Sequence, residues 1–272
     1  MSAHPISFVS YPGTIARYWN LTSRLAAREF AARYRGSHLG VLWAALTPLV
    51  TVLVFTFVFG VVFRAKWAGE STATSEFVII LFVGMIIHGI FVEAISRAPT
   101  LILNNSSYVK RVVFPLEILP LVVVITAVIN AAVGFVVVIV AHLILNGELR
   151  PTLIFLPFVL APYILAVLGL TMFVTSIGVF IRDIGHAVGF LITVTLFMAP
   201  IFYPISSVPE PYRVWLYLNP LTFTVEEARA VAIFGRSPDW EGLGLYTAGA
   251  LFVFAAGYAW FQKTRNGFAD VV

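Results

Sequence analysis

Long apolar runs dominate the hydrophobic pattern of this chain, and short polar or basic segments separate them. A helix that spans a bilayer needs about 20 mostly apolar residues. Six runs satisfy or approach this length, and they lie roughly at 38–63, 77–96, 114–145, 152–180, 187–205 and 243–261. We therefore predict an all-α integral membrane protein with six transmembrane helices, the third and fourth long enough to tilt.

The composition supports this prediction. Hydrophobic residues make up 60% of the 272 residues and charged residues only 11%, with a mean hydropathy of +0.95. Since a soluble domain usually carries about 25% charged residues, this chain lacks the polar groups needed to cover a globular surface. The isoelectric point near 9.5 does not indicate nucleic-acid binding, because a net charge of +4 on so apolar a chain makes no basic stripe.

The distribution of charge predicts the orientation. If the N-terminus is inside, the inner segments 1–37, 93–117, 181–186 and 262–272 hold 11 of the 17 basic residues and have a net charge of +6. The outer segments 64–76, 146–151 and 206–242 have a net charge of −2. This asymmetry predicts that both termini are cytoplasmic. Residues 1–37 have no continuous apolar core with a cleavage site, so we expect no removable signal peptide.

The N-terminal segment 14–36 has the pattern of a cationic amphipathic helix. Its arginines recur at intervals of 7, 4 and 7 residues, within a sector of about 40° on a helix. We predict a helix in the inner membrane interface, with aromatic residues at headgroup depth. It is either a surface anchor or a gate beside the inner mouth of a pathway for an anionic lipid-linked substrate. The residues assigned to this gate helix are Arg17, Tyr18, Trp19, Arg24, Arg28, Phe30 and Arg35.

The inner loop after the second predicted span reads NNSSYVKRVVFP from Asn104 to Pro115. A polar stretch is followed by a basic pair and then by Pro115, which can open the third helix. The basic pair is either a topology signal or part of a surface that receives a cytoplasmic partner. The residues assigned to that surface are Asn104, Asn105, Ser106, Ser107, Tyr108, Lys110 and Arg111.

The outer segment 198–236 is too apolar for a solvated loop, yet five prolines interrupt it. Its pieces 211–219 and 221–234 are too short to span a bilayer, so we predict a re-entrant helical segment over 206–236 that closes an outer vestibule. Adjacent glutamates raise the possibility of acid–base catalysis, but neighbouring residues diverge on a helix, which disfavours it. The residues assigned to the outer gate are Trp215, Tyr217, Asn219, Pro220, Glu226, Glu227 and Arg229.

Aromatic residues form stripes on two of the predicted spans. On the first span they recur at i, i+4 and i+8, and on the fifth they lie seven residues apart. Such stripes either face lipid and neighbouring helices or line a pathway on which the apolar faces of sugar rings stack. The residues assigned to a channel lining are Trp43, Thr47, Phe55, Phe59, Phe63, Phe190, Phe197, Phe202 and Tyr203.

Motifs for ATP hydrolysis and for common catalytic centres are missing from the sequence. The three lysines are Lys66, Lys110 and Lys263, and none follows a glycine, so there is no P-loop. The five histidines are scattered without the spacing of metal ligands, and only His88 lies near the middle of a predicted span. A lone histidine at that depth is more often hydrogen-bonded packing than part of a proton relay. The pattern is typical of a conduit driven by another chain.

Three stretches resemble one known family. ARYRGSHLGVLWA at residues 32–44, followed by Pro48, resembles the start of ABC-2-type permeases that export polysaccharide. Residues 108–120 are similar to their coupling segment, and residues 200–204 with 219–235 are similar to their outer re-entrant region. The resemblance covers essentially the whole chain in order.

The resemblance implies a single ABC-2 transmembrane domain at 38–262, between a cytoplasmic region 1–37 and a tail 263–272, with an inner coupling segment at 97–113. It implies a subunit that exports O-antigen, teichoic acid or capsular polysaccharide, linked to undecaprenyl, across a bacterial cytoplasmic (inner) membrane. Two copies would form a channel in contact with membrane lipids, with spans one and five as walls. Two copies of a separate ATPase would bind ATP and magnesium, and this chain would hold no cofactor or metal.

Other functions stay open at this stage. Arg35, Ser37 and Gly40 look closer to the O-antigen and teichoic acid branch than to the capsule branch. An ABC-2 permease for a drug or a lipid is an alternative, and so is a membrane enzyme acting on lipid-linked sugars, which would need carboxylates converging at one membrane face. A secondary transporter would need charged groups within its spans or inverted repeats, and neither is evident.

Overall fold

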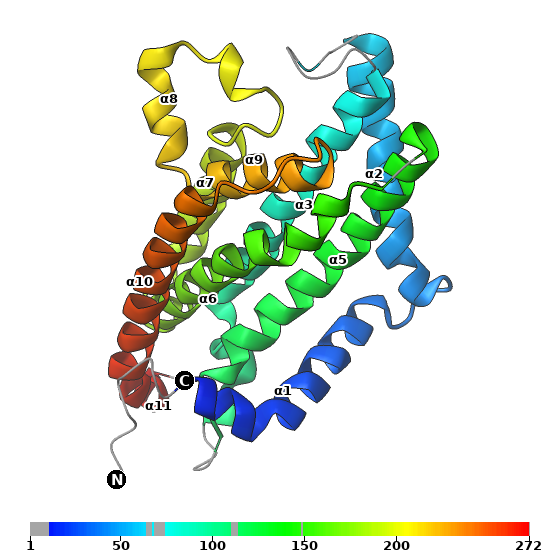
Figure 1. The fold of residues 1–272 in the computed structure, drawn as a ribbon. Coiled ribbons are helices and arrows are strands. Elements are labelled where there is room, and N and C mark those ends of the chain that lie inside the picture. Colours follow the sequence, from blue (N-terminus) through cyan, green and yellow to red (C-terminus); the bar gives the residue numbers. More distant parts are fainter. Residues whose placement is uncertain (1–10, 64–66, 68–73, 110–113, 148, 272) are drawn as a thin grey trace.

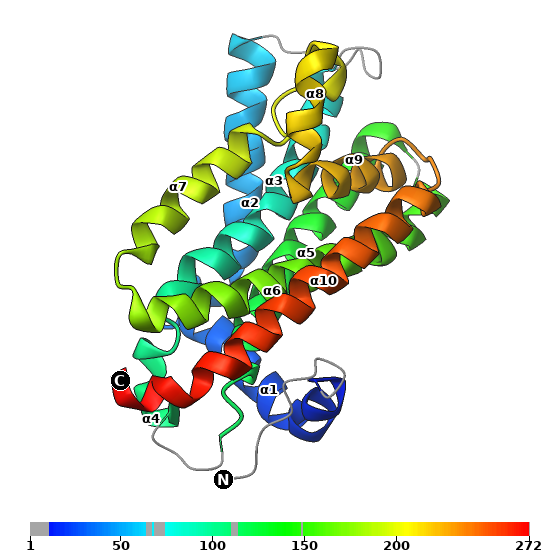
Figure 2. The ribbon, with the colours of Figure 1, turned by 90° about the vertical axis from the view of Figure 1, so that its left-hand side faces the viewer.

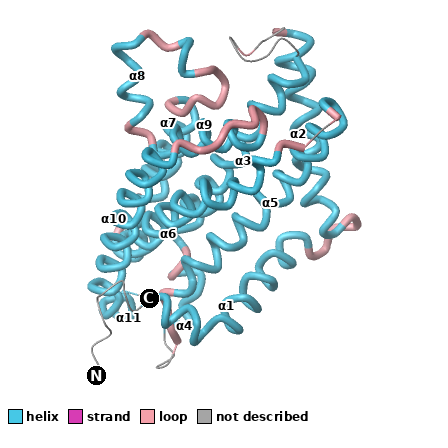
Figure 3. The backbone as a smooth tube through the Cα atoms, viewed as in Figure 1, coloured by secondary structure: helices cyan, strands magenta, loops and turns pink. Residues whose placement is uncertain are grey.

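The computed structural model describes residues 11–63, 67, 74–109, 114–147 and 149–271 (Figure 1). Within these ranges the chain is helical and has no strand, and short loops join the helices (Figure 3). The all-α prediction is confirmed for this part of the chain.

Four helices among the described residues are long and apolar enough to cross a membrane. They are α3 (Thr74–Arg97), α5 (Ile118–Asn146), α6 (Leu156–Phe180, preceded by a 3₁₀ turn at Pro151–Phe155) and α10 (Trp240–Thr264). They match the second, third, fourth and sixth predicted spans. We expected Pro115 to open the third predicted helix. That expectation was wrong, since α5 begins three residues later, at Ile118.

The first and fifth predicted spans correspond to shorter apolar helices. α2 (Trp43–Phe55) follows a 3₁₀ turn at Gly40–Leu42 and continues as a π-helix over Thr56–Val62. α7 (Ile184–Phe197) ends well before residue 205, because the following stretch contains Pro200 and Pro204, which cannot donate a helical hydrogen bond. That these two segments also cross the membrane stays a prediction.

Close backbone contact joins α6 to α10. A side chain on Gly257 of α10 would place its Cβ 2.0 Å from the carbonyl oxygen of Gly169 on α6, and one on Gly169 would meet the backbone of Phe254 at 2.5 Å. Glycine is therefore required on both sides of this crossing, as in many membrane helix pairs. Gly178 makes a similar contact lower on α6, where a Cβ would lie 2.2 Å from the carbonyl oxygen of Pro99.

α3 lies at the centre of the bundle. Of its most apolar stretch 78% is buried, against 28% for α10. Helices α2, α5, α6, α7 and α9 (Pro220–Ala232) all pack on it.

α1 (Tyr11–Tyr34) runs across one end of the bundle (Figure 1). The predicted arginine face is exposed, and Leu25 and Ala26 on the other face pack on Ile118 and Val122 of α5. The helix is not uniform, because Tyr18 has non-helical dihedral angles (φ −108°, ψ 16°) that divide it into two parts. The sequence pattern gave no sign of this kink.

The remaining short helices separate into two groups. α4 (Ser106–Val109) and α11 (Phe268–Val271) lie at the end of the bundle that carries α1, whereas α8 (Glu210–Tyr217) and α9 lie at the opposite end (Figures 1 and 2). The segments predicted to be inner and outer are therefore at opposite ends. Which end faces the cytoplasm stays a prediction.

Candidate translocation surface and its two ends

An aromatic cluster joins α2 to the chain that follows α7. The ring of Phe59 stacks on Phe202 with centroids 6.1 Å apart, and Phe202 lies 6.2 Å from Phe197 at the end of α7. On the other side, Phe59 contacts Phe55 and Phe63 at 5.8 Å each. The structure thus brings together aromatic residues of the first and fifth predicted spans, which are far apart in the sequence.

Much of the surface formed by α2 and α7 is uncovered in the single chain. Among the residues assigned to the lining, Phe63 is 67% exposed, Phe190 72% and Phe197 63%. No side chain described on α2 is buried, and on α7 only Val188 and Thr195 are. Tyr203 donates a hydrogen bond to the carbonyl oxygen of Phe197 at 2.8 Å, which fixes the turn after α7. We call the exposed faces of α2 and α7, with Phe202 and Tyr203, the translocation surface.

Trp43 and Thr47 lie at the opposite end of α2 from this aromatic cluster. Thr47 lines a cavity of about 400 Å³ that is enclosed by α1, α2, α3 and α5. Most of its wall is apolar, and its polar end is formed by Arg33, Glu93 and Asn130.

The polar end of this cavity is a hydrogen-bonded network. Both terminal nitrogens of Arg33 bind the carboxylate of Glu93 on α3, and the Asn130 amide donates to the same carboxylate at 2.8 and 3.1 Å. The hydroxyl of Tyr34 donates to the side-chain oxygen of Asn130 at 3.4 Å. This network ties the end of α1 to α3 and α5. Sequence reasoning missed it, although an asparagine inside an apolar helix was a usable signal.

Two further contacts hold α1, the predicted gate helix, against the bundle. Glu29 pairs with Arg97 at the end of α3, at 2.5 Å, and Arg28 donates a hydrogen bond to the hydroxyl of Tyr108 at 3.2 Å. The second contact links the predicted gate directly to the predicted coupling segment. Phe30 packs edge-on against Tyr34 at 5.4 Å, Arg17 lies 5.7 Å from the ring of Tyr18, and Arg24 and Arg35 are exposed.

The described part of the predicted coupling segment, residues 97–109, is a series of short turns. Asn104 and Asn105 donate to Thr100 and Leu101, one helical turn back, at 3.2 and 2.8 Å. Ser106 and Ser107 begin α4, and Tyr108 stacks on Phe114 with centroids 4.4 Å apart. Lys110 and Arg111 lie outside the described residues.

A buried ion pair closes this end of the bundle. Arg265, just after α10, contacts Glu117 at 2.8 Å and the carbonyl oxygen of Phe114 at 3.2 Å. Glu117 is buried, and its own carbonyl oxygen accepts a hydrogen bond from Tyr11 at 3.4 Å. The start of α1, the loop before α5 and the end of α10 are therefore joined, which the sequence did not reveal.

Arg229 organises the opposite end. Its side chain is 1% exposed and donates to three carbonyl oxygens, those of Ile80, Pro200 and Ile201, at 3.0, 2.5 and 3.0 Å. Glu226 accepts from it at 2.9 Å, and its guanidinium lies 4.6 Å from the centre of the Trp67 ring. Burial lowers the pKa of Arg229 to about 10 against the opposing effect of Glu226, so the group stays charged at neutral pH.

Other residues assigned to the outer gate have structural partners. Asn219 caps α9 by accepting from the Leu221 amide at 3.0 Å, and its amide donates to Thr195 of α7 at 3.0 Å. Pro220 is the first residue of α9, and its carbonyl oxygen accepts from Tyr246 at 2.9 Å. The side chains of Trp215 and Tyr217 on α8 are 58% and 61% exposed.

The adjacent glutamates diverge, as the helical geometry predicts. Glu226 contacts Arg229, whereas Glu227 accepts from the backbone amide of Asp239 at 2.9 Å. Burial raises the pKa of the Glu227 carboxyl, but its only described acceptor role is to hold the loop before α10. The two glutamates therefore bind different partners.

His88 has a packing role in the described structure. Its Nε2 lies 3.3 Å from the carbonyl oxygen of Ile192 and 3.4 Å from the hydroxyl of Thr195, both on α7. It therefore connects α3 to α7, in agreement with the packing interpretation. Among the residues that the structure describes, no group of three or more His, Asp or Glu side chains could hold a metal ion.

Comparison with known proteins matches this chain along most of its length. A model of the family described as "ABC-2 type transporter" matches residues 20–233. An O-antigen export system permease protein RfbA of Myxococcus xanthus is 28% identical over 94% of this chain and 96% of its own length. A protein of the same name from Klebsiella pneumoniae is 23% identical over 90% of this chain and 92% of its own. The polysialic acid transport protein KpsM of Escherichia coli is 25% identical over 86% and 90% respectively.

Proposed function

The chain belongs to the ABC-2 type transporter family, and from that premise we propose that it is the channel-forming subunit of an ATP-driven exporter of lipid-linked polysaccharide. The observation that carries the proposal is the similarity to an O-antigen export permease over more than nine-tenths of both chains. Chains of this family are transport subunits and not enzymes. The substrate we favour is an O-antigen-like polymer on an undecaprenyl anchor in the bacterial inner membrane.

A capsule-type polymer is the second candidate. It is supported by the similarity to the polysialic acid transport protein, which covers less of both chains than the first O-antigen permease does. A drug or lipid substrate has no comparable support among the similar proteins, so we rank it lower.

The energy for transport comes, in this proposal, from a separate ATPase. The sequence has no P-loop, so ATP and magnesium would be bound by two copies of that partner. The coupling segment 97–113 is the proposed docking surface. The hydrogen bond between Arg28 and Tyr108 supports a mechanism in which movement of the docked partner displaces the gate helix α1.

A second copy of this chain would complete the pathway. The exposed faces of α2 and α7 are apolar and aromatic, so two copies facing each other would enclose a passage with walls of that character. Aromatic faces stack on the apolar faces of sugar rings without strong directional preference, which suits a polymer that must slide. The charged face of the second part of α1, with Arg28 and Arg35 exposed beyond Tyr18, would meet the anionic anchor at the inner mouth, and α8 and α9 would close the outer one.

Complementation tests this function directly. The chain is expressed with its cognate ATPase in a bacterium that makes an O-antigen but lacks its own permease. We expect long surface polysaccharide to return only when both chains are present, and a complex of two permease and two ATPase chains to be purified. ATP hydrolysis by the purified permease alone would contradict the proposal. Return of a capsule polymer, but not of O-antigen, in matched strains would favour the second candidate.

A further inference from the structure

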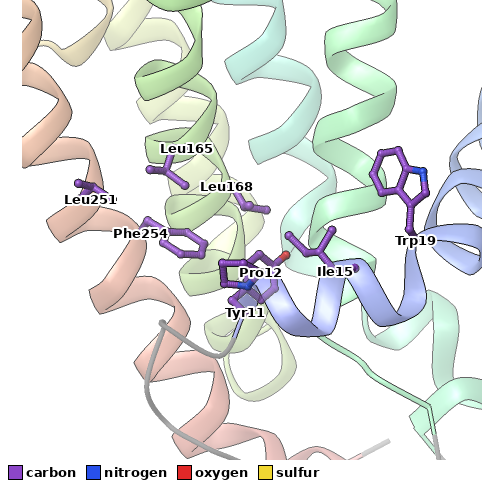
Figure 4. Close-up of a pocket in the computed structure, with 9 residues that line it drawn as sticks. Tyr11, Pro12, Ile15, Trp19, Leu165, Leu168, Leu251 and Phe254 are labelled. Atoms are coloured by element: carbon purple, nitrogen blue, oxygen red, sulfur yellow. The ribbon is translucent and has the colours of Figure 1, made fainter.

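An apolar groove of about 580 Å³ lies between the N-terminal part of α1, α6 and α10, and α10 lies on the side of the bundle opposite α2 (Figure 1). Leu165 and Leu168 of α6 form one wall and Leu251 and Phe254 of α10 another, while Ile15 projects from α1 toward the bundle (Figure 4). A second apolar groove of about 310 Å³ between α5 and α6 shares Leu165 and Leu168. The two grooves therefore lie next to each other along α6.

α1 bridges this groove because it is attached on both sides of it. Before the groove, Tyr11 is buried, with its ring 5.3 Å from Phe254 and 5.2 Å from Tyr258. Beyond it, Leu25 and Ala26 pack on α5. The non-helical residue Tyr18 lies between these attachments. The groove is therefore bounded by α1 because this helix is attached to the bundle on both sides of it.

The groove follows the path of a lipid chain. Its α1 lining lies at the end of the bundle, whereas Leu165 and Leu251 lie near the middle of the membrane-crossing stretches Pro151–Phe180 and Trp240–Val271. It therefore extends from α1 along the apolar length of α6 and α10, a direction that an acyl chain beside these helices also follows. Apolar walls without a partner lose dispersion contacts, so hydrocarbon is the natural filling.

The charge above the groove selects the headgroup. Residues 1–28 contain no aspartate or glutamate, and Arg17 and Arg24 are exposed on α1. An exposed cationic face over an apolar groove complements a lipid with a negative phosphate headgroup and a hydrocarbon chain. We propose that the groove binds one chain of an anionic phospholipid of the inner leaflet, with its phosphate beside Arg17. The site is separate from the translocation surface and does not depend on which polymer is exported.

Quenching of Trp19 by brominated lipid tests this site, since Trp19 is one of the groove's lining residues. The full-length chain and a Trp19→Phe variant are reconstituted in phosphatidylcholine vesicles with increasing amounts of chain-brominated phosphatidylglycerol or chain-brominated phosphatidylcholine. The difference between the two proteins isolates Trp19 from the other five tryptophans. We expect half-maximal quenching of Trp19 at a roughly fivefold lower fraction of the anionic lipid, the preference that one arginine near the surface supplies.

Two variants and a competitor make the result decisive. Arg17→Gln is expected to remove the preference for the anionic lipid, whereas Arg182→Gln, also exposed, keeps it. Ala16→Phe, at another lining residue, is expected to fill the groove and weaken quenching by both lipids.

Equal quenching by both lipids in the wild-type chain, or none, overturns the proposal. Displacement of the brominated lipid by undecaprenyl phosphate, but not by unbrominated phosphatidylglycerol, would overturn it by assigning the groove to the substrate's anchor. None of these readouts requires export, so failure here leaves the proposed function standing.

Discussion

Helices α6 and α10 are apolar, and so are helices α2 and α7, but α6 and α10 pack closely on each other whereas α2 and α7 leave large faces uncovered. α6 and α10 approach so closely that Gly169 and Gly257 leave no room for a Cβ. α2 and α7 carry large aromatic side chains instead, and most of these are exposed. Apolarity alone therefore does not say what a membrane helix packs against.

The difference distinguishes a closely packed scaffold, formed by α3, α6 and α10, from the proposed translocation surface on α2 and α7. Small residues allow backbones to come into contact, and this gives a membrane helix pair a stable interface without a hydrophobic driving force from water. Bulky exposed side chains do not make such an interface within one chain. These side chains are available to contact lipid, a second copy of the chain or a polymer. Substitutions in the two regions should therefore have different consequences.

The largest effect on stability is expected at Arg229, which fastens the end of α7 to the scaffold helix α3. Arg229→Met leaves three carbonyl oxygens without their donor, and we expect the free energy of unfolding to fall by about 3–5 kcal/mol, as for loss of a buried charge's partners. Thermal unfolding in lipid-containing micelles measures the loss. Arg182→Met serves as the control, because this arginine is exposed and a surface substitution usually changes stability by about 0.5 kcal/mol or less. Equal melting temperatures of the two variants would contradict the role of Arg229 in holding the end of α7 to α3.

Gly257→Ala tests the close packing of the scaffold pair. The new Cβ would meet the carbonyl oxygen and carbon of Gly169 at 2.0 and 2.7 Å, so the helices must separate, and we expect a loss of about 3 kcal/mol of stability. Gly249→Ala on the same helix is the matched control, since nothing lies within 4 Å of its Cβ position. A Gly257 variant that melts like the Gly249 variant would show that the crossing is looser than described.

Substitutions on the translocation surface are expected to show the reverse pattern. Replacing Phe190, Phe197 and Tyr203 together with alanine should lower stability by no more than about 1 kcal/mol, the usual value of one hydrogen bond such as that of Tyr203, because Phe190 and Phe197 are exposed. Export should slow by roughly twofold to tenfold, since each aromatic contact with a sugar ring is worth only about 1 kcal/mol. The rate at which polymer reaches the cell surface measures this. Leu245→Ala, at an exposed position on α10, is the control, and undiminished export in the triple variant would mean that the stripe faces only lipid.

The smallest effect on stability is expected at the coupling segment. Charge reversal at Lys110 and Arg111 removes a proposed ATPase contact. If the pair belongs to that docking surface, stability should change by no more than about 0.5 kcal/mol. Stimulation of the partner's ATP hydrolysis and export should both fall, while insertion into the membrane is retained. If export and stimulated hydrolysis are unchanged, the basic pair is a topology signal and the docking assignment is wrong.

Much of the fold was predictable because a membrane helix can be recognised in the sequence from the length and apolarity of its run of residues. The long runs at 77–96 and 152–180 match α3 and α6 closely, and the proline-delimited pieces at 211–219 and 221–234 match α8 and α9. Helix ends were less predictable, because they depend on local backbone geometry. α7 stops eight residues before the expected end, and Tyr18 interrupts α1.

Long-range polar contacts were beyond the reach of the sequence pattern. Arg229 was selected as part of an outer gate, but its role in holding the chain at Pro200 to α3 depends on residues 149 and 29 positions away. The Arg33–Glu93–Asn130 network and the Arg265–Glu117 pair likewise join helices whose register no local pattern specifies. A charge near a helix end looks like a topology signal until a partner from another helix is known.

The sequence by itself determined that the chain is a helical membrane protein, where most of its long helices lie, and which faces of α1 carry charge. These properties follow from periodicity and from the cost of placing polar groups in hydrocarbon, both of which act locally along the chain. Only the tertiary structure decided that α6 and α10 meet at glycines, that α2 and α7 remain uncovered, and that α1 bridges an apolar groove. Those features depend on which helix packs against which. An apolar helix face can contact lipid or another helix equally well, because both neighbours are apolar, so the polarity of the face does not identify its partner.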